Sequence, residues 1–190
     1  MKTKKLLFLL SILLSVNILF AQQMQDSTNT SQQKTKQKKN LSDKIYYGGT
    51  FGISLGSYTM IGIYPLVAYK LTPKLSAGVK FSYQYVSDNR YSTKYNTSNY
   101  GGSVFSRFRV TQRLYTHVEY EQMNYDLYDY STNSTSREWV PFLYVGAGYS
   151  QNLGGNVWLN LQVLFDVLQN ENSPYNGWEP FFSVGIGAGF

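Results

Sequence analysis

Cysteine is absent from this 190-residue chain, which excludes disulfide bonds, thiolate metal sites, a cysteine nucleophile and anchoring through a lipidated cysteine. Charged residues are also scarce, at 15% of the chain, and His117 is the single histidine. The sequence contains no metal-ligand cluster, no phosphate-binding loop and no paired-carboxylate motif. We therefore expect no metal, no cofactor and no catalytic residue.

A basic face that could follow nucleic acid is missing as well, although the formal net charge is +6. Seven of the 17 Lys and Arg residues and one of the 11 Asp and Glu residues precede Leu41, which leaves ten of each sign in the rest. The main part of the chain is thus formally neutral. This balance argues against nucleic acid as a partner.

Long apolar runs are confined to the start of the chain. Lys2, Lys4 and Lys5 precede the apolar run 6–20, which is typical of a signal peptide over residues 1–21. The alternative, a membrane-anchoring helix, would need about 20 apolar residues, more than this run contains. Residues 22–44 are rich in Gln, Ser, Thr, Asn and Lys, so we expect a disordered periplasmic linker there.

From residue 45 onward the hydrophobic pattern has a period of two, which indicates β-strands. In the segment 75–86, for example, Val79, Phe81 and Tyr83 alternate with Lys80 and Ser82. The pattern predicts eight strands, at 45–55, 58–69, 75–86, 100–110, 114–124, 139–150, 157–168 and 178–190. Short turns alternate with longer polar loops, of which 87–99 and 125–138 are the clearest.

This arrangement is typical of a barrel that crosses a membrane. Each run is long enough for a transmembrane strand, which needs about 9–11 residues. Tyr and Trp gather near the strand ends, where aromatic girdles lie. We predict an all-β fold for residues 45–190, an eight-stranded antiparallel transmembrane up-and-down β-barrel with a filled polar interior. The alternative is a soluble barrel of the lipocalin kind.

Charged residues set which strand faces point inward. An arginine on the lipid face costs roughly 2–4 kcal/mol near mid-membrane, so Arg107 and Arg109 should both point inward. We expect Arg107 to fall within one pairing step of Glu121, and Arg109 within one step of Glu119, across the hairpin. An eight-stranded barrel is just wide enough for side chains to fill it. The expected interior ion-pair network comprises Lys80, Arg107, Arg109, Glu119, Glu121 and Asp166. A proton or ion path through this network, and hence a small-solute channel, is the alternative.

His117 has two interpretations. With Glu119 two residues further on and serines nearby, it could belong to a Ser/His/Glu hydrolase site. However, its neighbours at a spacing of two include acids, it lies close to a predicted turn, and no hydrolase motif is matched. We therefore expect a hydrogen-bonded core histidine.

Several of these features together resemble a known family. The leader, the Gly-rich strand 46–56, the segment 65–78 and Phe190 resemble the small outer-membrane β-barrel proteins of Gram-negative bacteria, of the OmpA-barrel and OmpX type. The resemblance implies an outer-membrane location, contact with outer-membrane lipid and lipopolysaccharide, and a non-enzymatic structural or surface-interaction role. Loops 87–99 and 125–138 would then face outside and could bind an extracellular ligand. The class also contains lipid-modifying enzymes such as lipid A deacylases, which remain an alternative.

The segment 178–190 carries a further expectation. Its outward row resembles the carboxy-terminal signal that the barrel-assembly machinery reads, and comprises Phe182, Val184, Ile186 and Phe190. On the opposite face, Gly185, Gly187 and Gly189 should close against Gly48, Thr50 and Gly52 of the first strand.

Overall fold

The computed structural model describes residues 44–54, 58–89, 95–129, 134–175 and 178–189. The expected signal peptide 1–21, nearly all of the expected linker 22–44 and Phe190 lie outside the described residues. Eight strands follow one another along the chain: β1 (Ile45–Ser54), β2 (Tyr58–Lys70), β3 (Leu75–Asp88), β4 (Tyr95–Arg109), β5 (Leu114–Asp129), β6 (Ser134–Gly154), β7 (Val157–Asp166) and β8 (Pro180–Ala188).

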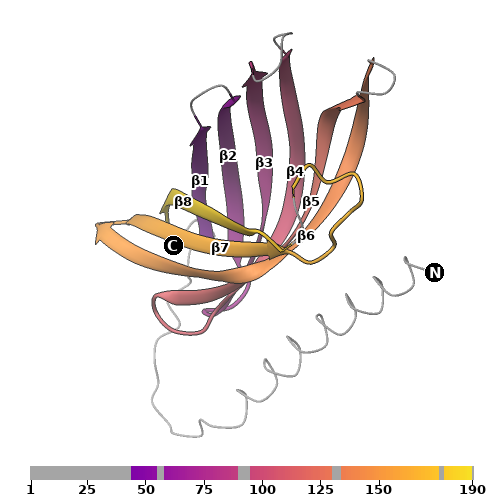
Figure 1. Ribbon diagram of the computed structural model, residues 1–190. Helices are drawn as coiled ribbons and strands as arrows, with labels where there is room; N and C mark the ends of the chain where they lie inside the picture. Colours follow the sequence, from indigo (N-terminus) through magenta and orange to yellow (C-terminus); the bar gives the residue numbers. More distant parts are fainter. Residues whose placement is uncertain (1–43, 55–57, 90–94, 130–133, 176–177, 190) are drawn as a thin grey trace, which may run out of the picture. The chain divides into compact units, whose positions relative to one another are not determined.

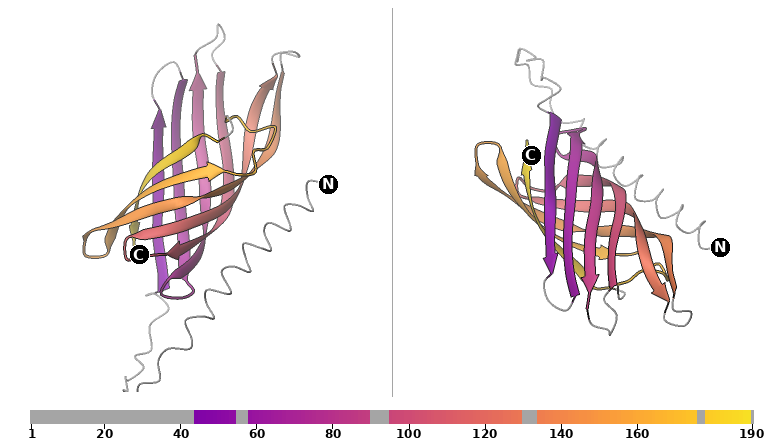
Figure 2. Two further views of the ribbon diagram at one scale, coloured as in Figure 1. Left: turned by 60° about the horizontal axis from the view of Figure 1, so that its bottom comes forward. Right: turned by 90° about the horizontal axis from the view of Figure 1, so that it is seen from above.

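The strands form a closed antiparallel barrel in which each strand pairs with the next and β8 pairs with β1. Figure 1 shows β1 to β4 side by side, with β6 to β8 crossing them at a steep angle, and Figure 2 shows the same sheet from two further sides. The predicted fold class is therefore confirmed. We call the end with the short β2–β3, β4–β5 and β6–β7 turns the turn end, and the opposite end the hairpin end.

The two faces of the sheet have opposite chemistry. Large apolar side chains lie on the outside, where Phe81, Phe182 and Ile186 are 69%, 75% and 60% exposed, while Ser82 and Gln84 are buried inside. A water-soluble barrel would bury its apolar face, so this inside-out pattern identifies strands that meet lipid. Within the described ranges, no helix is long and apolar enough to cross a membrane.

Two segments expected to be loops are largely strand. β3 runs to Asp88 and β4 begins at Tyr95, while β5 and β6 continue as a ladder out to the pair Asp129 and Ser134. The expected loops 87–99 and 125–138 are thus much shorter. Tyr, Ser and Thr are compatible with strands, and a hairpin that leaves the membrane can be polar on both faces. The polar composition of these two segments therefore suggested loops at residues that are in fact paired in strands.

The last strand also differs from expectation, because it begins at Pro180 rather than at Trp178. Trp178 has a φ of 66°, a left-handed conformation that cannot continue an extended strand. Trp178 remains exposed, at 67%, just before the strand.

The seam between β1 and β8 is short. It comprises four residue pairs, from Tyr47 with Ala188 to Thr50 with Gly185, whereas β1 and β2 share ten. Gly48 opposes Gly187 as the sequence suggests, but Gly52 and Gly189 are not part of the β1–β8 ladder. Gly189 has a φ of 86° and leaves the strand direction there.

Candidate functional site in the barrel interior

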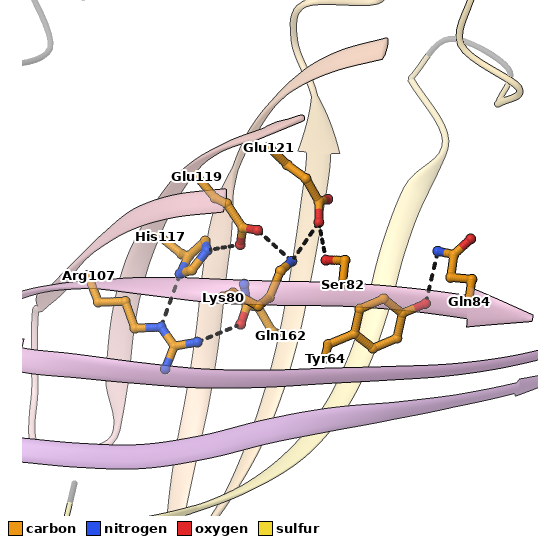
Figure 3. Close-up of polar contacts among 9 residues, drawn as sticks. All are labelled: Tyr64, Lys80, Ser82, Gln84, Arg107, His117, Glu119, Glu121 and Gln162. Carbon is orange, nitrogen blue, oxygen red and sulfur yellow. Dashed lines mark hydrogen bonds and ion pairs between the residues drawn. The ribbon is translucent and has the colours of Figure 1, made fainter. Parts of the chain in front are cut away.

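A cluster of charged and polar side chains occupies the middle of the barrel (Figure 3). Lys80 on β3 reaches across to β5, where its Nζ lies 2.5 Å from Oε1 of Glu119 and 3.5 Å from Oε1 of Glu121. Ser82 donates a short hydrogen bond to Glu121. Both carboxylates are buried, so the ammonium group of Lys80 provides the charge compensation that a low-dielectric interior demands.

His117 connects this acidic pair to an arginine. It is 1% exposed, and its Nδ1 accepts a hydrogen bond of 3.0 Å from Nε of Arg107. Its Nε2 lies 2.8 Å from Oε2 of Glu119. An arginine Nε–H can only donate, so Nδ1 carries no proton and Nε2–H donates to Glu119. The contacts therefore define a neutral histidine with one tautomer.

Arg107 is buried, and its guanidinium group contacts side chains from β4, β5 and β7. Its guanidinium carbon lies 4.8 Å from the ring centre of Phe105 and 5.1 Å from that of Tyr115. Gln162 on β7 accepts a hydrogen bond of 3.5 Å from Nη2, and one of 3.3 Å from the hydroxyl of Tyr115. Two cations and two carboxylates thus offset one another around a neutral imidazole.

The pairing of the two arginines differs from the sequence expectation. Arg107 opposes His117 and Arg109 opposes Tyr115, so neither lies directly across from a glutamate. The turn centred on Gln112 pairs residues that are equally distant from it, and this fixes the register. Arg109 is half-buried and, with Lys70 and Lys74, lines the opening at the turn end.

Asp166 also differs from its expected place in the ion-pair network. It lies in the same row as Glu119, with Tyr144 between them. Its carboxylate accepts hydrogen bonds from the backbone N–H groups of Leu143, Leu168 and Gln169, at 3.0 to 3.2 Å. Asp166 therefore ends β7 and holds the following turn, a role that depends on backbone positions and that side-chain spacing alone could not indicate.

An aromatic cluster lies beside the polar residues and extends towards the hairpin end. Phe142 and Tyr144 on β6 stack at 5.5 Å, and both are buried. Tyr175, from the segment between β7 and β8, lies 4.9 Å from Phe181 and 6.5 Å from Tyr125, measured between ring centres. Period-two alternation places Phe142 and Tyr144 on the inward face of β6, but it does not indicate that they meet Tyr125, Tyr175 and Phe181 in one cluster.

The backbone ladder between β4 and β5 ends at the pair Tyr100 and Asn124. Beyond this pair, hydrogen bonds from side chains connect the two strands. Thr97 donates to Oδ2 of Asp126 at 3.1 Å, and the Asp126 N–H donates to Asn99 at 3.3 Å. Arg137 on β6 donates to the Ser98 carbonyl at 3.1 Å and to Asn124 at 3.0 Å. These contacts fasten the projecting β5–β6 hairpin to β4.

The chemistry available to this interior is limited. Both ring nitrogens of His117 are already hydrogen-bonded, so the ring offers no lone pair to a serine nucleophile. In the part of the chain that the structure describes, no group of three or more His, Cys, Asp or Glu side chains could hold a metal ion. The cluster is well suited to holding opposite charges in place.

Similarity to known proteins was found among solved structures. No protein-family model matches the chain, and no curated protein sequence matches it. Solved structures similar to it include the outer-membrane protein Ail of Yersinia pestis in a phospholipid bilayer nanodisc, with 11% identity over 76% of this chain and 97% of Ail, at a TM-score of 0.49. The N-terminal β-barrel domain of Pseudomonas aeruginosa OprF is 14% identical over 76% of this chain and 96% of that domain, at a TM-score of 0.46. Such a likeness concerns the fold.

The chain has the fold of a small transmembrane β-barrel. The closed eight-stranded topology and the apolar outer surface carry this statement. In the row expected to form the assembly signal, Phe182, Val184 and Ile186 are 75%, 57% and 60% exposed on the outer face of β8. The structure thus places three of the four residues together, and Phe190 lies outside the described residues.

Proposed function

We propose that this protein is a non-enzymatic component of the outer membrane whose barrel serves as a stable support for a surface-interaction site. The observation that carries the proposal is the charge-balanced, side-chain-filled interior. Lys80 is paired with two carboxylates, His117 is held at both nitrogens, and aromatic rings pack beside them. Such an interior stabilises a barrel and leaves its two ends to interact.

The projecting β5–β6 hairpin supports the interaction part of the proposal. Its ladder continues for five pairs beyond Asn124 and Trp139, the level of the outer aromatic belt, and ends with Asp129 and Ser134. Exposed residues 134–137 and the side-chain bridges to β4 present a polar, stiff surface outside the membrane. A pre-ordered surface loses less entropy on binding than a flexible loop would. We place an extracellular ligand at the hairpin end, on the described parts of the expected loops 87–99 and 125–138.

Two other functions are less well supported. A lipid-modifying enzyme of the lipid A deacylase kind would need a nucleophile beside His117, whose ring nitrogens are engaged by Arg107 and Glu119. A small-solute channel would need a water column past Phe142 and Tyr144, which are buried and stack on each other inside the barrel. The assays described next would detect either function.

Heat-modifiable migration tests the proposal directly. We expect the full chain, expressed in a Gram-negative host, to fractionate with the outer membrane and to migrate differently in SDS gels before and after boiling. A closed barrel with a paired interior resists SDS at room temperature, because its ladder has no free edge to open from. Recovery in the soluble fraction would contradict the proposal. So would fatty-acid release from lipopolysaccharide that His117→Ala abolishes, or stepwise conductance in planar bilayers.

The outward row on β8 leads to a second prediction. We expect deletion of Phe190 to lower the amount of heat-modifiable protein in the outer membrane several-fold, because the row with Phe182, Val184 and Ile186 would be read during assembly. Refolding of the same variant from urea into phospholipid vesicles should be nearly unchanged. Equal losses in the cell and in vesicles would instead indicate a structural role for the terminal residue.

A further inference from the structure

A hollow on the outer face of β5 to β8 lies beside an arginine at the turn end. Its volume is about 480 Å³, within the range of roughly 300–1,000 Å³ that is typical of ligand sites. The register explains its shape. Leu114, Tyr149, Leu161 and Val184 form one outward row across the four strands. Ala147, Val163 and Phe182 form the next row.

Ala147 produces the depression, because it is the smallest side chain in either row and its neighbours are bulky. Phe182, 75% exposed, lies in the same row two strands away, and Leu161, 44% exposed, lies in the neighbouring row on β7. The lining is almost entirely apolar and faces the zone of the barrel surface that meets lipid. An alkyl chain lying in the hollow would contact β6, β7 and β8 together, whereas a smooth barrel wall offers contact on one side only.

A cationic group is held at the mouth of this hollow. Arg113 directly precedes Leu114 in the β4–β5 turn and is exposed. Its Nη1 donates to the hydroxyl of Tyr149 at 3.3 Å, and that hydroxyl donates to Gln151 at 3.0 Å. Tyr149 accepts one of the five N–H donors of the guanidinium and orients the group beside the hollow. Planar guanidinium groups bind phosphate oxygens in a bidentate manner.

We propose that this hollow and Arg113 together form a binding site for one phospholipid of the periplasmic leaflet. Its phosphate binds Arg113 beside Tyr149, and one acyl chain lies over Ala147 and Val163, beside Leu161 and Phe182. The inference rests on the proposed membrane location, because the turn end faces the periplasm only in that orientation. Charge complementarity at the mouth and an apolar hollow behind it favour an anionic amphiphile over a second copy of the chain.

The β2–β3 turn provides a matched control. There Thr72 Oγ1 accepts from the N–H groups of Lys74 and Leu75 at 3.2 and 2.9 Å. In the β4–β5 turn, Thr111 Oγ1 accepts from those of Arg113 and Leu114 at 3.2 and 3.0 Å. Lys74 and Arg113 thus occupy equivalent positions in equivalent turns. Of the two, Arg113 stands beside the residues that line the hollow.

Photo-crosslinking with a defined lipid tests the site. The full chain would be reconstituted in vesicles that contain phosphatidylglycerol with a diazirine in the middle of one acyl chain, and the adducts mapped by peptide mass spectrometry. We expect adducts to concentrate on residues 147, 163 and 182. Arg113→Gln should reduce them about tenfold, the lower end of what a hydrogen bond to a charged group contributes. Ala147→Phe should remove them by filling the hollow, and Lys74→Gln should leave them unchanged.

Three results would overturn the site. They are adducts spread evenly around the outer surface, equal losses in Arg113→Gln and Lys74→Gln, and protein–protein cross-links through the hollow in place of lipid adducts. Heat-modifiable migration of each variant separates this test from the test of the proposed function. A chain that fails to enter vesicles contradicts the membrane location itself, whereas a folded barrel with evenly spread adducts contradicts the lipid site alone.

Discussion

Replacing Glu119 by alanine should lower the free energy of unfolding by about 3–5 kcal/mol, the range found when one partner of a buried ion pair is removed. Glu119 is 2% exposed and contacts both Lys80 and His117. Its loss leaves the Lys80 ammonium with Glu121 at 3.5 Å and leaves the Nε2–H of His117 without its acceptor. Urea unfolding in phospholipid vesicles, followed by tryptophan fluorescence, measures the change.

Two further variants make the comparison specific. Glu138→Ala removes a glutamate that bonds Asn172 at the exposed rim, and it should change stability by no more than about 0.5 kcal/mol. Lys80→Met in the Glu119→Ala background should deepen the loss, because the buried Glu121 then loses the cation 3.5 Å away. A cost below about 1 kcal/mol for Glu119→Ala, the size found for exposed pairs, would mean that water reaches the cluster.

Period-two alternation was sufficient to predict the barrel and the direction in which most side chains point. Lys80, Glu119 and Glu121 could be assigned to the interior because a charge on the lipid face is costly. The partner of each arginine required the register, and the register follows from where a turn is centred. With the turn centred on Gln112, Arg107 meets His117 and not a glutamate.

Other features could not follow from pattern, because they depend on residues that meet only after closure. Asp166 binds backbone N–H groups on β6 and in the following turn, which no spacing rule connects. Tyr175 enters the aromatic cluster from outside the strands. The hollow over Ala147 exists because three further strands bring bulky neighbours beside it. Alternation along a strand determines the face on which a side chain lies, whereas the tertiary arrangement determines which residues it contacts.

Replacing Gly185 by valine should prevent most of the protein from closing into a heat-modifiable barrel. A Cβ atom at this position would lie 2.5 Å from the Gly49 carbonyl oxygen and 2.7 Å from Cγ2 of Thr50. The backbone of β1 cannot yield as a flexible side chain would. We expect a cost of about 3 kcal/mol, the upper end of the usual range for overpacking. Four residue pairs hold β1 to β8, so separating one of them removes a large share of the seam.

Ser183→Val is the matched control, since it adds a branched side chain on the same face of β8, two residues earlier. Ser183 pairs with Gln162 on β7 and precedes the β1–β8 ladder, which begins at Gly185. The Ser183→Val variant should therefore fold as the unmodified chain does. The assembled fraction of both variants is read from unboiled SDS gels after refolding into vesicles.

If Gly185→Val assembles as fully as Ser183→Val, closure does not depend on the close approach of β1 and β8, and the rest of the ladder must hold the barrel. If both fail, bulk anywhere on the inner face of β8 is harmful and the seam has no special role. If Gly185→Val alone fails, the pairing of β1 with β8 is the step that converts a curved sheet into a barrel.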